Sequence, residues 1–314
     1  MTAEIGPSAA ESEASSVSAG RRSHRDLAKE RVDAVNQKAG RDLPAAIIVG
    51  LVLISLVVGT LVFWNWGFVI LVAVALAAGA VELHVAMRDH AKMSSAIMPI
   101  VVGTVAIVVG SYLAAERPGE LPSTTVLLAS LGLTVVAALM WRMLQGPVAF
   151  VRDAAASMLT IAYLPLLGSF LTLMLGESQG AIRVAATILC VSASDTGGYI
   201  AGVLFGRHKL APRISPKKTW EGLVGSFLLA MAVGAAMAHF ALGAQFWVGL
   251  VLGAVMVVTG TSGDLVESMV KRDLGIKDMS NFLPGHGGVM DRIDSVLVAA
   301  PAAWFVMFLL VPGV

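Results

Sequence analysis

Three aspartates near the C-terminus have the residue type and the spacing of a divalent-cation site. Asp264 ends one apolar run, and Asp291 and Asp294 begin the next, three residues apart and so on one face of a helix. Helix N-termini favour negative charge, so this pair has an alternative interpretation as simple helix-capping acids. Clustered carboxylates nevertheless suit Mg²⁺, which binds a few of them together with substrate phosphates. The pattern therefore predicts that Asp264, Asp291 and Asp294 hold Mg²⁺.

The residues after Asp264 extend the polar character along one face. If the segment stays helical, Glu267, Ser268 and Lys271 follow Asp264 at helical spacing. Lys271 alone is equally well explained by a long side chain that reaches toward the membrane surface. Asp264 resists that explanation, because a charge inside the membrane costs about 2.5–3.5 kcal/mol. The stripe indicates a polar track that faces a cavity.

Two further segments contain candidate binding residues. In "PGHGGVMDRID", glycines around His286 relax the backbone and allow a tight turn or the close approach of a ligand. Upstream, Asp195 lies inside an apolar run, where a polar residue that joins helices is the alternative to a binding role. Lys217 and Lys218 stand between Ser-Pro and Thr-Trp-Glu-Gly, and we interpret them as phosphate contacts rather than as topological charges alone.

Together these residues indicate phosphoryl or nucleotidyl transfer. Such reactions depend on positioning and on charge neutralisation by metal and basic groups. The sequence contains neither GxxxxGK[ST] nor HExxH, and no nucleophile–base pair is evident. The net charge of +1 argues against a nucleic-acid binder. A lipid phosphate that meets a nucleoside triphosphate is the inferred substrate pair.

Transmembrane helices must position these residues. The chain has 314 residues, of which 57% are hydrophobic and only 14% charged, against roughly 25% charged residues in soluble proteins. A helix needs about 20 apolar residues to cross a bilayer. We predict an all-α polytopic membrane protein with nine spans, at 44–64, 67–87, 95–115, 122–142, 155–175, 181–205, 222–242, 245–263 and 292–311.

The distribution of basic residues predicts the orientation of these spans. The polar segment 1–42, which we expect to be a disordered head, and the loops after even-numbered spans hold 20 of the 22 Lys and Arg residues. By the positive-inside rule, that side faces the cytoplasm. We expect residues 43–175 to form a scaffold of five spans. Residues 176–314 would then carry the chemistry, with cytoplasmic loops at 206–221 and 264–294.

The run "SMVKRDLGIKDMSNFLPGHGGVMDRID", Ser268 to Asp294, resembles the signature of the phosphatidate cytidylyltransferase (CDP-diacylglycerol synthase) family. The segment "SDTGGYIAGVLFGRHKL" and the following "SPKKTWEG" resemble an upstream block of the same family. The resemblance covers residues 192–311. It implies a multi-pass enzyme of the inner membrane that converts CTP and phosphatidic acid to CDP-diacylglycerol and pyrophosphate, feeding phospholipid synthesis.

The resemblance also implies cofactors, partners and residue roles. Mg²⁺ is the expected cofactor, a second, monovalent cation stays open, and a homodimer among membrane lipids is expected. Asp264 and Asp291 would hold metal with Asp294 close by, and Lys271 would act with them in catalysis. The remaining substrate-binding candidates are Asp195, Lys217, Lys218, Ser268, Arg272, Lys277, Asp278, His286, Gly287, Gly288 and Arg292.

Two other function classes compete with this assignment. A CTP-dependent kinase of polyprenol or phytol type would phosphorylate an alcohol, and the complete glycine–aspartate run of the signature argues against it. A cation-coupled transporter would use Asp195 and Asp264 as ion ligands inside the membrane. It predicts two related halves with broken helices, and we find no convincing internal repeat in the sequence.

Overall fold

The computed structural model describes residues 43–117, 121–280, 282–283 and 287–311. The expected head, residues 1–42, lies outside this part of the chain. Within it, eight helices are long and apolar enough to cross a membrane, and Ile48–Phe63 is a shorter apolar helix. The predicted all-α polytopic class with about nine helical spans is therefore confirmed for the described residues.

The first half of the described chain consists of helices. They are α3 (Leu43–Phe63), α4 (Asn65–Ala91), α5 (Ile97–Ala115), α6 (Ser123–Met143), α7 (Phe150–Ile161) and α8 (Leu167–Leu175). A π-helical turn, η1 (Ala162–Leu166), joins α7 to α8 and contains Pro165. Proline has no N–H to donate and disturbs the regular helical ladder, which accounts for a break at this point.

The second half contains four long helices and one hairpin. They are α9 (Gly180–Phe205), β1 (Lys209–Ala211), β2 (Ser215–Thr219), α10 (Trp220–Ala236) with a π-helical end η2 (Met237–Ala241), α11 (Phe246–Asp273) and α12 (Met290–Leu310). The strands pair antiparallel, with Lys209 opposite Thr219. The sequence analysis did not predict this hairpin in the loop 206–221.

The segment 264–294 also differs from the predicted loop. Helix α11 continues through Asp273, ten residues past the predicted end of the span, and α12 begins at Met290. The helix extends because its polar face is satisfied locally, with an ion pair between Lys271 and Glu267 one turn apart. It ends where Gly275 adopts a left-handed conformation. The connection between the two helices is therefore 274–289, and Asp264 lies inside a helix.

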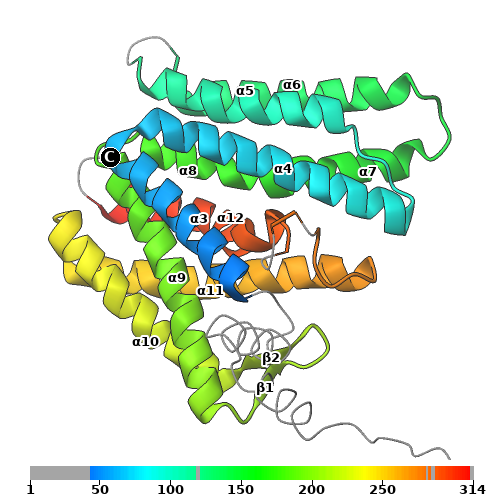
Figure 1. The fold of residues 1–314 in the computed structure, drawn as a ribbon. Helices are drawn as coiled ribbons and strands as arrows, with labels where there is room; N and C mark the ends of the chain where they lie inside the picture. Colours follow the sequence, from blue (N-terminus) through cyan, green and yellow to red (C-terminus); the bar gives the residue numbers. More distant parts are fainter. Residues whose placement is uncertain (1–42, 118–120, 281, 284–286, 312–314) are drawn as a thin grey trace, which may run out of the picture.

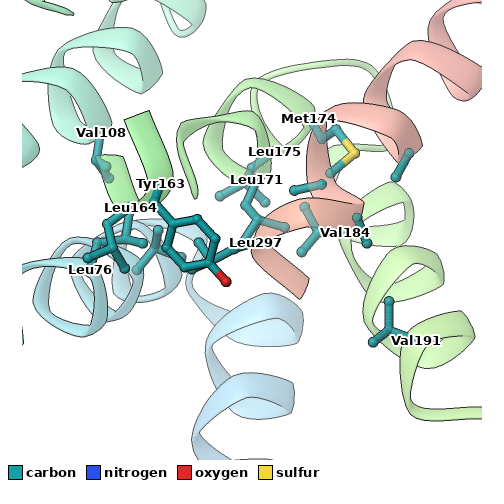
Figure 2. Packing of buried hydrophobic residues seen from close by; sticks show 14 of the residues in the cluster. Leu76, Val108, Tyr163, Leu164, Leu171, Met174, Leu175, Val184, Val191 and Leu297 are labelled. Atoms are coloured by element: carbon teal, nitrogen blue, oxygen red, sulfur yellow. The ribbon is translucent and has the colours of Figure 1, made fainter. Parts of the chain in front are cut away.

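The helices pack in layers around α12 (Figure 1). Helix α12 contacts α11 on one side and α4 and α8 on the other, while α9 packs along α10 and meets the hairpin at its end. Figure 2 shows part of the buried cluster, in which Leu76 of α4 and Leu297 of α12 lie near Tyr163 of η1. This packing places the first turn of α12 between the end of α11 and the first half of the molecule.

Candidate active site

A cavity of about 420 Å³ lies where α9, α10, α11, α12 and the hairpin meet. Its walls come from segments that are up to 100 residues apart in the sequence. Polar side chains from every one of these elements face the same space. Nine of the predicted site residues line it: Asp195, Lys217, Lys218, Asp264, Lys271, Asp278, Asp291, Arg292 and Asp294.

Three carboxylates converge on one wall of the cavity. Oxygen atoms of Asp264, Glu267 and Asp294 all lie within 4.8 Å of one another. Glu267 and Asp294 are buried, and the Oε1 atom of Glu267 has no hydrogen-bond partner among the described residues. Closely spaced buried carboxylates repel one another and are stabilised by a cation or a proton between them. An oxygen-rich group with an unpaired buried oxygen fits a hard divalent cation.

Close approach of two helices brings these carboxylates together. Gly263 of α11 faces the backbone of α12, and a Cβ atom at this position would lie 2.7 Å from the carbonyl oxygen of Asp294. A larger residue would push the two helices apart. Asp264, the next residue, therefore reaches the level of Asp294, whose own Oδ1 accepts a hydrogen bond from the Ser295 N–H at 2.7 Å.

Asp291 occupies a different place from the one expected for a metal ligand. Its Oδ1 pairs with Lys271 Nζ at 2.8 Å, and its Oδ2 accepts the N–H groups of Met279 and Gly288 at 3.0 and 2.8 Å. Both oxygens thus hold protein donors. Glu267, not Asp291, completes the group with Asp264 and Asp294, because it lies one helical turn from Asp264 on the face that the sequence analysis identified.

Basic side chains of the hairpin form a further wall of the cavity, next to the carboxylates. Lys218 Nζ lies 2.5 Å from Asp264 Oδ2, and its side chain is 26% exposed. Lys217, the neighbour on the same strand, also lines the cavity and is exposed. Strand neighbours point to opposite faces, so the two lysines approach the cavity differently. The wall therefore offers one lysine paired with the carboxylates and one with its charge accessible.

Hydrogen bonds to α10 hold the hairpin in place. The hydroxyl of Thr219 accepts the N–H of Gly222 and so caps the helix. Glu221 in the first turn accepts the N–H groups of Arg207 and His208, at 3.1 and 3.2 Å, and also contacts the His208 ring. The base of the hairpin, where its strands join α9 and α10, is therefore fixed.

Several predicted residues lie away from the cavity. Ser268, Arg272 and Lys277 are not among the described residues that line it, and Arg272 and Lys277 are exposed. Gly287 and Gly288 form the turn before α12, where Gly287 has a φ of +79°. Their contribution is to the backbone of the turn rather than to the cavity wall. His286 lies outside the described residues.

The structure also adds residues that the sequence analysis did not single out. Tyr163 of η1 is buried, and its hydroxyl has no hydrogen-bond partner in the described part of the chain. Pro165, two residues further along the chain, was the sequence signal that could have drawn attention to this turn. Four Ser and Thr residues of the transmembrane helices also line the cavity: Ser194, Ser226, Thr261 and Ser295. Single hydroxyl residues are common in transmembrane helices, so nothing in the sequence marked these four as site residues.

Comparison with known proteins agrees with this geometry. A model described as the cytidylyltransferase family matches residues 44–310. The chain is 43% identical over 290 residues to a protein of Mycobacterium leprae named phosphatidate cytidylyltransferase, covering 87% of this chain and 90% of the relative. A protein of the same name from Mycobacterium bovis is 38% identical over 297 residues, which cover 90% of this chain and 94% of the relative.

A more distant organism gives a shorter match. A protein named phosphatidate cytidylyltransferase from Staphylococcus saprophyticus is 41% identical over 150 residues, or 48% of this chain and 57% of the relative. The fold and the site define a polytopic membrane protein with a carboxylate–lysine cavity. The chain belongs to the cytidylyltransferase family.

Proposed function

We propose that this protein transfers the cytidylyl group of CTP to phosphatidic acid, giving CDP-diacylglycerol and pyrophosphate. The observation that carries the proposal is one cavity in which Asp264, Glu267 and Asp294 face Lys217 and Lys218 within a bundle of membrane-spanning helices. The names of the relatives, which match over about nine-tenths of this chain, support the choice of substrates.

The reaction needs no covalent enzyme intermediate. A phosphate oxygen of phosphatidic acid attacks the α-phosphorus of CTP, and a new P–O bond forms. The bond from the α-phosphorus to the oxygen that bridges it to the β-phosphorus breaks, and pyrophosphate leaves with the electron pair. Lys217 and Lys218 neutralise phosphate charge in this scheme, while the cavity walls hold the two reactants in line.

Asp264, Glu267 and Asp294 are the residues that would hold Mg²⁺. The ion would supply charge stabilisation for the phosphate oxygens as a Lewis acid. Lys271 lies behind this group, between Glu267 and Asp291, at 2.5 and 2.8 Å. We assign Lys271 to offsetting the charge of the buried carboxylates, and Asp291 to orienting Lys271 and bracing the turn that precedes α12.

We further propose that the cavity faces the cytoplasm, where CTP is available. The hairpin with Lys209, Lys217 and Lys218, and the connection 274–289, follow even-numbered predicted spans. The segment 1–42 and the loops after even-numbered spans hold 20 of the 22 Lys and Arg residues. On this orientation the protein is a multi-pass protein of the inner membrane. The homodimer that the family resemblance implies stays a proposal, and cross-linking in membranes would test it.

An assay with purified protein tests the proposed function. With CTP labelled at the α-phosphorus, phosphatidic acid and Mg²⁺, we expect label in the lipid fraction and release of unlabelled pyrophosphate. With CTP labelled at the γ-phosphorus, the lipid fraction should stay unlabelled. Transfer of the γ-label to a lipid alcohol would instead identify a kinase, and no transfer of either label would contradict the proposal.

A further inference from the structure

Glu82, in the last third of the second predicted span, makes polar contacts with the start of α12 and the segment that precedes it. Its Oε1 accepts the hydroxyl of Ser280 at 2.6 Å and the N–H of Val289 at 2.9 Å, and its Oε2 accepts the N–H of Met290 at 2.9 Å. About 200 residues separate Glu82 from Ser280 in the sequence. One carboxylate of α4 thus accepts two N–H groups at the N-terminus of α12 and one hydroxyl of the connection that precedes it.

These contacts satisfy a carboxylate that would otherwise be costly. A charge in a transmembrane helix needs partners, because the membrane offers none. The first N–H groups of a helix have no intrahelical acceptor, and the positive end of the helix dipole favours an anion there. Glu82 supplies that anion from a neighbouring helix. The pairing therefore gives hydrogen-bond partners both to the carboxylate of α4 and to the first N–H groups of α12.

The turn before α12 is built to admit this carboxylate. A Cβ atom at Gly288 would lie 2.7 Å from Glu82 Oε2, so a larger residue would displace the Glu82 side chain. The N–H of Gly288 points to Asp291 instead, at 2.8 Å. Two carboxylates thus hold the turn, Glu82 from the first half of the molecule and Asp291 from α12 itself.

We infer that Glu82 is a positioning residue for the active site. It is not among the described residues that line the cavity. By fixing the N–H groups of Val289 and Met290, it sets where α12 begins, and therefore where Asp294 stands relative to Asp264. The kinetic part of this inference rests on the proposed function, whereas the structural part, that Glu82 holds the turn, does not.

The variant Glu82→Gln tests the inference with the smallest change in shape. An amide has a single acceptor oxygen, so it leaves at least one of the three donors without its acceptor. Glu116→Gln is the matched control, because Glu116 also joins two helices of the first half by accepting the indole N–H of Trp66 at 3.1 Å. Hydrogen–deuterium exchange of the full-length protein in detergent reports on peptides that span 279–292, and steady-state kinetics report kcat and KM.

In Glu82→Gln we expect exchange in 287–292 to accelerate about tenfold or more, because the Val289 and Met290 amides lose an acceptor. We expect kcat to fall about 10- to 100-fold, since a small misplacement of catalytic groups has effects of that size. The KM for CTP should change less than about threefold. Because loss of folded protein would also lower apparent kcat at constant KM, kcat is calculated per folded molecule. Glu116→Gln should match the wild type in all three measurements.

Unchanged exchange and kcat in Glu82→Gln would overturn the inference, as would an equal loss of activity in Glu116→Gln. If Glu82→Gln does not fold, Glu82→Asp decides, because it keeps the charge but withdraws the carboxylate from the amides. The same local exchange and the same loss of kcat are then expected, and wild-type behaviour overturns the inference. If the wild type makes no CDP-diacylglycerol, the proposed function fails, while the exchange measurement still decides whether Glu82 holds the turn.

Discussion

In the first half of the molecule, α3 to α8, the buried pair Arg142–Asp153 joins structural elements, whereas in the second half, α9 to α12, the buried carboxylates of Glu267 and Asp294 line a cavity. Asp153 of α7 pairs with Arg142 of α6 at 3.0 Å and accepts the N–H of Ser94 at 3.0 Å. Asp264 and Asp294 instead face each other and an open space. The two groups of acids therefore differ in their surroundings, and we propose that only the acids at the cavity take part in catalysis.

The largest expected effect comes from the carboxylates of the second half. Asp264→Asn and Asp294→Asn should each lower kcat about 100-fold or more, because losing a metal ligand removes several kcal/mol of charge stabilisation. Asp89→Asn is the control, since Asp89 is an exposed acid of α4 that pairs with Arg88. Retention of a tenth of the activity in both cavity variants would contradict the proposal that the cavity acids hold the metal ion.

The lysines of the hairpin should show a smaller effect. Replacing Lys217 and Lys218 together by Arg keeps the charge, yet we expect kcat/KM to fall about tenfold, because guanidinium is larger and planar. Replacement of both by Gln should reduce kcat/KM further and raise a substrate KM, since charge-assisted hydrogen bonds to phosphate are lost. Kinetics of purified variants measure both effects.

Correct insertion is the control for the lysine variants. Three basic residues stay in the same loop, Arg207, Lys209 and Arg213, so membrane orientation should be unchanged. Wild-type kinetics in the double Arg variant would mean that these lysines serve topology alone. Lys217 and Lys218 would then have a structural role, like the Arg142–Asp153 pair, and no role in the reaction.

In the first half, breaking the Arg142–Asp153 pair should affect stability and not catalysis. Both side chains are 7% exposed, and an unpaired buried charge is destabilising by about 3 kcal/mol or more. We expect Asp153→Asn to lower the midpoint of thermal unfolding while kcat per folded molecule stays within about twofold. A large loss of kcat in well-folded Asp153→Asn would show that this pair acts on the site as well.

Removal of residues 1–40 should have the smallest effect. The match to the family model begins at residue 44, and every described residue of the candidate site lies beyond it. We therefore expect specific activity in detergent to equal that of the full chain. A collapse of activity in well-folded truncated protein would place part of the site or of a dimer contact in this segment.

The sequence was sufficient to predict the helical class, the approximate spans and nine of the 20 residues that line the cavity. These predictions succeeded because apolar length and helical spacing are local properties, and because Asp264, Glu267 and Lys271 share one helix face. The different surroundings of Glu267 and Asp291 were not predictable. They depend on which backbone N–H groups the turn 279–288 presents, and that is a property of the folded chain.

The part played by the first half was also hidden in the sequence. Glu82 is a single acid in an apolar span, and nothing in its neighbours indicates that it meets Val289 and Met290. The hairpin was missed for a related reason. Its strands are three and five residues long, too short for an alternating pattern to emerge.

Metal binding tests the central claim most directly, because the account assigns Asp264, Glu267 and Asp294 to the cation and Asp291 to protein donors. Mn²⁺ binding to the purified protein, measured by electron paramagnetic resonance without substrates, compares Glu267→Gln with Asp291→Asn. We predict that Glu267→Gln weakens Mn²⁺ binding about tenfold or more, since one of three carboxylate ligands is lost, while Asp291→Asn stays within about threefold of the wild type. Loss of binding in Asp291→Asn with retention in Glu267→Gln would contradict the account.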